Sequence, residues 1–226
     1  MEFLSAVTAW LLDGAHWAGN DGVPHRLLEH LLLSASPVLV AALVALPIGL
    51  YIGHTGRGAL AAVSIANIGR ALPSLGIMGI ALLFTAGLGF GFGEPALLIA
   101  LFALAVPPMV TNAYVGLRAV DRDLVEAARG MGMRETQLLA RVELPLALPV
   151  ILAGVRIAAV QVVATVSLGA LLATGGLGRF IIDGIANKDY PEVFVGAVLT
   201  ALLAVLTEFA FSAGQRAATS PGLQRL

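Results

Sequence analysis

The chain lacks cysteine, and it is poor in charged and aromatic residues. Its 226 residues contain no Cys, and only 12% of them are charged, about half of the share usual in globular proteins. The absence of cysteine excludes disulfide bonds, iron–sulfur clusters and thiolate metal sites. The formal net charge of −1 leaves no basic surface for nucleic acid.

Lysine and histidine are too sparse for two further kinds of site. The single lysine, Lys188, has no phosphate-binding glycine-rich loop around it, so we expect that this chain does not hydrolyse ATP. The histidines are His16, His25, His30 and His54, and none of their spacings is typical of metal ligands. With no Ser/His pair or paired carboxylates in the apolar stretches, we expect a chain that is not an enzyme.

Apolar residues, by contrast, form long runs. The hydrophobic share is 58%. A helix needs about 20 apolar residues to cross a hydrocarbon layer about 30 Å thick, and these runs are continuous rather than alternating, as helices require. We therefore predict an all-α integral membrane protein with five transmembrane helices at residues 31–53, 59–84, 95–117, 146–173 and 193–214.

Basic residues near the ends of these helices are unequally divided between the two sides. Lys and Arg in short loops favour the cytoplasmic side. If the loop 118–145 is cytoplasmic, that side holds Arg57, Arg118, Arg122, Arg129, Arg134, Arg141, Arg216 and Arg225. The other side holds only Arg26, Arg179 and Lys188. We predict that the amino terminus lies outside and the carboxyl terminus inside.

The predicted orientation divides the chain into three parts. Residues 27–214 form the membrane domain, and 215–226 form a cytoplasmic tail. Residues 1–26 lie outside, either as a short interfacial helix with Trp10 and Trp17 at the headgroup layer or as a plain extracytoplasmic tail.

Charged residues gather in one loop. Ten of them lie between residues 118 and 143: Arg118, Asp121, Arg122, Asp123, Glu126, Arg129, Arg134, Glu135, Arg141 and Glu143. Asp123, three residues before Glu126, is typical of a helix N-cap. The following helix has Leu124, Ala127, Ala128 and Met131 on one face.

Glycines and prolines predict how this loop continues. Gly130 and Gly132 end the first helix, and a second short helix follows at about 134–142. Pro145 and Pro149 then open the next membrane helix, where prolines in the first turn are tolerated. The loop is therefore predicted to be a helix–turn–helix outside the membrane.

Seven residues of the loop also match a known pattern. Glu126, Ala127, Ala128, Gly132, Val142, Leu144 and Pro145 have the spacing EAA-x3-G-x9-I-x-LP, with Val142 in place of Ile. The segment resembles the EAA loop of ABC importer permeases. That resemblance implies that these residues form a coupling helix and its support, which dock into a groove on a separate ATPase subunit. An ordinary charged cytoplasmic loop is the alternative interpretation.

The resemblance also implies partners. The ATPase subunit would bind ATP and Mg²⁺, so this chain itself needs no cofactor. Five helices are too few to enclose a pathway, so a second copy or a similar permease would complete the pore. The aromatic share of 6% provides no obvious cage for quaternary ammonium groups, which implies a separate extracytoplasmic solute-binding protein.

Residues 30–210 resemble one branch of the family, the permeases for glycine betaine, carnitine, choline and proline. The segments that carry this likeness are Leu46-Pro47-Ile48-Gly49, Ala71-Leu72-Pro73-Ser74-Leu75, 126–133, 142–154 and Gly175-Gly176-Leu177-Gly178. Arg70 departs from the branch, which more often has a neutral polar residue there. The resemblance implies import of a small zwitterionic or quaternary-ammonium osmoprotectant across a bacterial inner membrane.

Several polar residues lie within the predicted membrane helices. An arginine at the centre of a helix costs about 2.5–3.5 kcal/mol on insertion scales, so Arg70 and Arg156 should face protein or water. They could line the solute pathway with Asn67 and Gln161, or they could tie helices together. Glu208, in the last predicted helix, is the expected structural partner of Arg156.

Three other functions remain open. The first is an importer permease for another small solute, such as methionine. The second is a secondary transporter with Arg70, Arg156 and Glu208 as coupling groups, although the chain has no inverted repeat. The third is an intramembrane enzyme or assembly factor, for which no catalytic set of residues is present.

Overall fold

The computed structural model describes residues 2–60, 64, 73–90 and 92–219. Every regular element in these residues is helical, and no strand occurs among them, which confirms the predicted all-α class. The chain forms two compact units, and four long helices continue from one unit into the other. Unit 1 consists of Met1–Val38, Leu72–Phe102 and Ala159–Thr207; unit 2 consists of Leu39–Ala71, Ala103–Ala158 and Glu208–Leu226.

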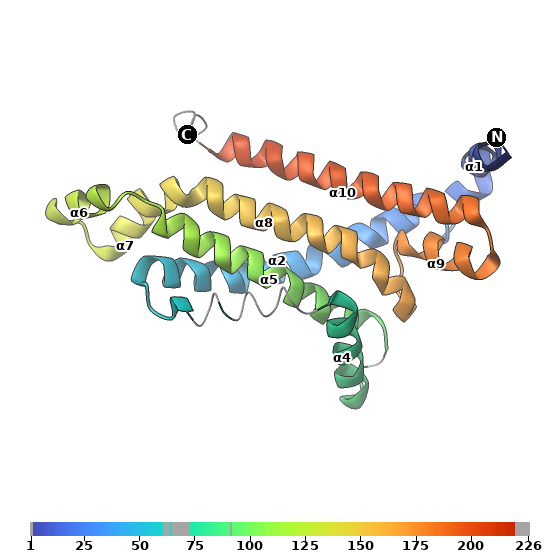
Figure 1. The fold of residues 1–226 in the computed structure, drawn as a ribbon, viewed down its shortest axis with the longest axis horizontal. Coiled ribbons are helices and arrows are strands. Elements are labelled where there is room, and N and C mark those ends of the chain that lie inside the picture. The colour runs from blue at the N-terminus through green and yellow to red at the C-terminus, as the bar shows by residue number, and fades with distance from the viewer. Residues whose placement is uncertain (1, 61–63, 65–72, 91, 220–226) are drawn as a thin grey trace. The chain divides into compact units, whose positions relative to one another are not determined.

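Figure 1 shows the helices in chain order. The elements are α1 (Glu2–Leu12), the 3-10 turn η1 (Gly14–Trp17), α2 (Val23–Thr55), α4 (Ser74–Gly87), α5 (Glu94–Arg118), α6 (Arg122–Gly130), α7 (Glu135–Leu138), the π-helical η2 (Leu139–Glu143), α8 (Leu144–Val166), the 3-10 helix η3 (Ser167–Leu172), α9 (Gly178–Asn187) and α10 (Tyr190–Ala218).

Four helical segments of the described residues are long and apolar enough to cross a membrane. They are Val23–Thr55, Glu94–Arg118, Glu135–Leu172 and Tyr190–Ala218. Three of them contain a whole predicted span, and Glu135–Leu172 contains all of the predicted span 146–173 except its last residue. Residues 61–63 and 65–72 of the predicted span 59–84 fall outside the described residues, and its last part, residues 74–84, belongs to the shorter helix α4. The number of five spans therefore stays a prediction.

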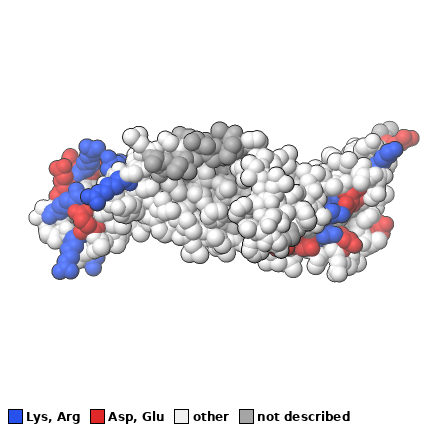
Figure 2. All heavy atoms as spheres, turned by 90° about the horizontal axis from the view of Figure 1, so that it is seen from below, with Lys and Arg blue, Asp and Glu red and all other residues white. Residues whose placement is uncertain are grey.

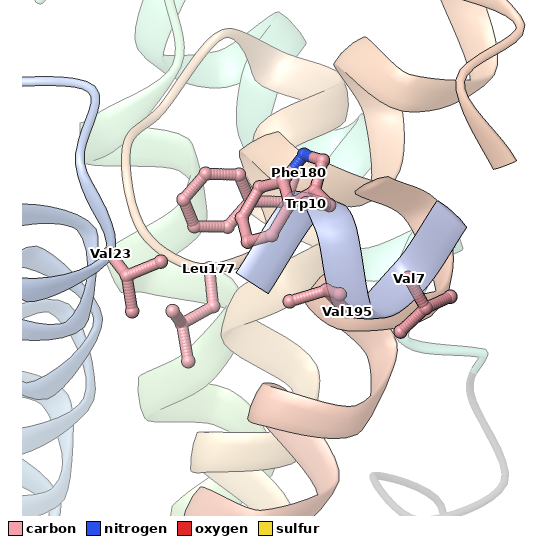
Figure 3. Packing of buried hydrophobic residues seen from close by; sticks show 6 residues of the cluster. All are labelled: Val7, Trp10, Val23, Leu177, Phe180 and Val195. Carbon is pink, nitrogen blue, oxygen red and sulfur yellow. The ribbon is translucent and has the colours of Figure 1, made fainter. Parts of the chain in front are cut away.

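The core of unit 1 joins the amino-terminal helix to the rest of the unit. Its buried side chains are Val7, Trp10, Val23, Leu177, Phe180 and Val195 (Figure 3). The Trp10 ring meets the Phe180 ring edge-on, with centroids 5.7 Å apart, and stacks on His16. An aromatic pair of this kind contributes about 0.5–1.5 kcal/mol beyond its buried area. Trp10 is a core residue because α1 packs onto α9 and α10, and its predicted position at the headgroup layer stays a prediction.

In unit 2, glycines allow α2, α5 and α8 to approach closely. A Cβ atom at Gly49 of α2 would lie 2.6 Å from the Cβ of Ala113 in α5, and one at Gly154 of α8 would lie 2.6 Å from the Cβ of Asn112. Small residues at such crossings are typical of membrane helices, where van der Waals packing drives association. Asn112 also donates a hydrogen bond to the Pro108 carbonyl, 2.8 Å away.

Prolines do not divide the helices as the sequence suggested. Pro149 was predicted to open a helix but lies inside α8. Two further prolines, Pro107 and Pro108, also lie inside a continuous helix, α5. The predicted short helix 134–142 is not separate either: α7, η2 and α8 follow one another without a break. A π-helical stretch immediately before Pro145 accommodates this residue, which lacks an N–H group and crowds the carbonyl four residues earlier.

The close approach at Gly154 gives a test of this packing. Alanine stabilises a helix by about 1 kcal/mol relative to glycine where there is room for its Cβ atom. At Gly214 in α10 an added Cβ meets nothing within 4 Å, so Gly214→Ala should raise the melting temperature in detergent. Gly154→Ala should lower it, because overpacking typically costs about 1–3 kcal/mol. Equal shifts in the two variants would contradict the packing.

Candidate functional site

The segment between α5 and α8, residues 121–143, forms a helical bracket in unit 2. Asp121 caps α6: its carboxylate accepts the backbone N–H of Asp123 at 2.9 Å. The predicted cap, Asp123, is therefore wrong by two residues and lies in the first helical turn. An Asx cap needs its side chain to reach the N–H two or three residues ahead, and Asp121 has that geometry as well as the non-helical backbone.

A glycine turn ends α6. Gly132 has φ +84°, and its N–H donates to the Arg129 carbonyl while the Met133 N–H donates to the Ala128 carbonyl. These two bonds are those of a Schellman motif, which requires a left-handed residue at the position of Gly132. The predicted end of the helix at Gly130 and Gly132 is confirmed, and the motif glycine has a clear structural reason.

The apolar residues of α6 point in two directions. Val125 and Ala128 face the unit: Ala128 is 2% exposed, and Val125 packs against the cluster that includes Leu117 and Ile151. Leu124 and Met131, on the other side, are 51% and 73% exposed. The predicted single face of Leu124, Ala127, Ala128 and Met131 is thus wrong in one member, since Ala128 turns inward and the other three remain exposed.

We name Leu124, Ala127 and Met131 the outer stripe. These positions lie three, then four residues apart, so they share one side of the helix. Glu126, the first residue of the matched pattern, is also exposed, but it lies on the side of α6 that carries Arg122 and Arg129. Nothing in the described part of unit 2 covers the outer stripe, which makes it a surface on which a partner could bind.

The second half of the pattern supports the first. Leu144 packs against the apolar cluster of Ala113, Leu117, Val120, Ala147 and Ile151, and Val142 is half-buried in η2. Pro145 is exposed in the first turn of α8. These residues fix the junction between the bracket and α8 rather than forming part of the outer stripe.

Ion pairs hold the bracket together. The Arg129 guanidinium donates two hydrogen bonds to the Glu135 carboxylate, at 2.9 and 3.0 Å, across the Gly132 turn. The Glu135 carboxylate raises the pKa of Arg129 above its ordinary value, mainly through these hydrogen bonds. Figure 2 shows basic and acidic atoms mixed over the bracket, whereas the adjoining visible helix surface is uncharged.

His54, at the end of α2, adds a contact that sequence reasoning missed. Its Nδ1 lies 2.5 Å from Oε2 of Glu143, and its Nε2 lies 3.3 Å from Oε2 of Glu135. The side chain of Glu143 is only 7% exposed. Glu143 stands out in the sequence as an acidic residue at the start of an apolar run. Nothing in the sequence pairs it with a histidine 89 residues away.

A polar cavity of about 340 Å³ lies beneath α6. It is lined by residues of α2, α5, α6 and η2, among them His54, Arg118, Arg122, Glu126, Arg129 and Glu143. Charged side chains of the bracket therefore line a cavity, while the apolar outer stripe is exposed to solvent.

The structure describes only some of the polar residues predicted within the membrane. Arg156 lies in unit 2, where its Nη1 is 3.3 Å from Oε1 of Glu208, while its Nε is buried without a partner. Gln161 is an exposed residue of unit 1. Asn67 and Arg70 lie outside the described residues. The Arg156–Glu208 pair agrees with the structural role that was one of the two alternatives.

The glycine segment at 175–178 is also held in place. In unit 1, the N–H of Gly176 donates to Oε2 of Glu29 at 2.9 Å, and the N–H of Leu177 donates to Nδ1 of His30 at 3.2 Å. The other ring nitrogen of His30 bonds to the Val163 carbonyl at 2.8 Å. A Cβ atom at Gly175 would collide with the Glu29 carboxylate, which explains the glycine there. The Glu29–His30 pair was not predicted.

Known proteins with similar sequences belong to one group. Residues 45–219 match the family described as binding-protein-dependent transport system inner membrane component. The chain is 34% identical over 203 residues to the choline transport system permease protein OpuBB of Bacillus subtilis (strain 168), covering 89% of this chain and 91% of that protein. It is 36% identical over 191 residues to the carnitine transport permease protein OpuCB of Listeria monocytogenes, covering 82% and 85%.

Solved structures show the same fold. An inward-facing structure of the MetNI methionine ABC transporter has a chain with a TM-score of 0.73 and 26% identity, covering 85% of this chain and 94% of that chain. An amino acid ABC transporter with histidines has a TM-score of 0.74 at 20% identity, covering 96% and 98%, which concerns the fold alone.

The left-handed glycine of the bracket gives a second prediction. An added Cβ meets nothing within 4 Å at either Gly130 or Gly132, but only Gly132 has a positive φ. Gly132→Ala should therefore destabilise the turn by about 1 kcal/mol, and Gly130→Ala should not. Amide hydrogen exchange at residues 131–134 should accelerate about fivefold in the first variant alone; equal exchange in both would refute the turn.

The Arg156–Glu208 pair gives a third prediction. If the pair ties α8 to α10, Arg156→Gln and Glu208→Gln should each lower the melting temperature, and the double variant should lose less than their sum. The expected coupling is about 0.5–1 kcal/mol, because both side chains are partly exposed. An Arg156→Gln variant of unchanged stability that no longer transports would instead place Arg156 in the pathway.

Proposed function

Since the chain belongs to the family of binding-protein-dependent transport system inner membrane components, we propose that it is the permease subunit of an ATP-driven importer for a small osmoprotectant. The solute would be zwitterionic or carry a quaternary ammonium group, as glycine betaine, carnitine and choline do. The relatives that support this choice are named for choline and carnitine transport. The alignment with this chain covers most of the length of each relative.

The outer stripe of α6 is the observation that carries the coupling role. Leu124, Ala127 and Met131 form an apolar, exposed surface on a short helix that is capped at both ends. Exposed apolar surface with a polar surround is typical of a protein–protein contact. In the proposed complex a groove of the ATPase subunit receives this stripe, and the small side chain of Ala127 lets the helix approach closely.

The remaining pattern residues would transmit the contact. Glu126 lies at the cavity beneath α6, Ala128 packs α6 onto unit 2, and Gly132 forms the turn. Val142, Leu144 and Pro145 fix the junction with α8. ATP and Mg²⁺ would bind to the partner, and this chain would contribute no catalytic residue.

Other subunits complete the proposed importer. A second copy of the chain, or a related permease, would form the other half of the pore, and an extracytoplasmic binding protein would deliver the solute. The amino terminus would lie outside, with the bracket in the cytoplasm. Asn67, Arg70 and Gln161 remain candidate pathway residues, and Arg156 belongs with them only if its pairing with Glu208 proves dispensable.

An importer for another small solute is the second candidate. The likeness to a methionine transporter chain supports it, but at 26% identity that likeness is lower than the likeness to the choline and carnitine relatives. Solute-stimulated ATP hydrolysis by the reconstituted complex, measured with glycine betaine, choline, carnitine and methionine in turn, separates the two.

A bulky side chain on the outer stripe tests the docking role. Ala127→Trp should reduce both the co-purified ATPase and the solute-dependent ATP hydrolysis in liposomes by about tenfold or more, because a residue at the centre of an interface is closely packed. Thr136→Trp, at an exposed position of α7 that is not part of the outer stripe, is the matched control and should leave both unchanged.

Two outcomes would contradict the proposal. Normal ATPase binding by Ala127→Trp would remove the outer stripe from the interface. Uptake that continues in the complete absence of an ATPase subunit would instead identify a secondary transporter.

A further inference from the structure

We propose that His54 is a positioning residue that links the bracket to α2, so that movement of α6 reaches this membrane helix. The inference rests on the proposed function and deepens it, since it concerns how force from the ATPase would enter the membrane domain. It starts from a histidine that lies between two carboxylates at the base of the bracket.

Four charged or titratable side chains form a continuous row in unit 2. Glu143 of η2 faces Nδ1 of His54, Glu135 of α7 faces its Nε2, and Arg129 of α6 bonds to the other side of Glu135. The row thus begins beside α8, passes through the last turn of α2 and ends in the helix that carries the outer stripe. Within the described residues, His54 makes the polar contacts that α2 has with the bracket.

The two ring nitrogens show why a histidine suits this place. Nδ1 of His54 faces Oε2 of Glu143 at 2.5 Å, and Nε2 faces Oε2 of Glu135 at 3.3 Å. Because an imidazole carries two nitrogens, this one side chain can contact both carboxylates.

Burial makes the link to Glu143 the stronger of the two. The side chains of His54 and Glu143 are 13% and 7% exposed, whereas that of Glu135 is 57% exposed. A buried carboxylate without its partner is strongly disfavoured, so Glu143 and His54 should move together. The apolar contacts of Leu46 and Leu50 with the cluster around Leu117 hold the same part of α2 near the bracket.

The surroundings of His54 define its electrostatic environment. The cavity beneath α6 also brings Arg118 of α5, and Arg122 and Glu126 of α6, to the same space. The ion-pair contacts that His54 makes within the described residues are with the carboxylates of Glu135 and Glu143.

The test separates docking from transmission. The complete importer is reconstituted in liposomes, and ATPase co-purification, solute uptake and ATP consumption are measured for His54→Gln, Glu143→Gln and the double variant. His25→Gln is the matched control, because it makes the same change at the other end of α2 on a side chain that is 42% exposed.

We expect His54→Gln to retain the ATPase but to raise the ATP consumed per solute imported by about fivefold to tenfold. Glu143→Gln should do the same, and the double variant should be no worse than either single one, since both remove one link. Glu135→Gln, at an exposed position, should have a smaller effect in the same direction, which keeps the test open if a buried substitution prevents folding.

Unchanged ATP consumption per solute in His54→Gln, with the ATPase bound, would overturn the inference and leave the proposed function intact. The inference would also be overturned if the increases in ATP consumed per solute imported multiplied in the double variant. A wild-type chain that binds no ATPase would refute the proposed function itself.

Discussion

The cost of placing an ionised side chain in hydrocarbon, about 2.5–3.5 kcal/mol for an arginine at the centre of a helix, determines where this chain can carry charge. Outside the membrane helices the charged residues concentrate in the bracket, where they pair with one another across a glycine turn. Arg156, which does lie in a long apolar helix, has Glu208 opposite it on α10. The same constraint leaves the long helices with apolar and small residues, which pack by close approach at positions such as Gly49 and Gly154.

The helix α2 receives polar contacts near both of its ends, each within a different unit. In unit 1, Glu29 and His30 hold the backbone of the glycine segment at Gly176 and Leu177. In unit 2, His54 contacts the carboxylates of Glu135 and Glu143. The middle of the helix carries neither acidic nor basic residues. Polar contacts therefore fix the position of α2 near each of its ends, and its middle is held by apolar packing. Such a helix suits the proposed function, in which binding of a partner to the bracket must affect the membrane helices.

Long helices could be predicted from the sequence, whereas of the long-range contacts only the Arg156–Glu208 pair was expected. Four of the predicted spans coincide with helices that are long and apolar enough to cross a membrane, because hydropathy depends on composition along the chain. Spacing also located the Gly132 turn, which obeys a local backbone rule. The cap at Asp121 was missed because two nearby aspartates have similar local signals. Trp10 and the Glu29, His30 and His54 contacts were missed for another reason: each depends on residues far away in the chain, and a single sequence contains no record of which distant side chains meet.

The account depends on the outer stripe of α6 lying in the cytoplasm against an ATPase subunit. The absence of native cysteine makes a direct measurement possible: a single cysteine at Met131, which is 73% exposed, is labelled with a membrane-impermeant maleimide in sealed vesicles of known orientation. The account predicts labelling only from the cytoplasmic side, and protection from it when the ATPase subunit is bound. Labelling from the outer side, or full labelling within a complex that hydrolyses ATP, would contradict it.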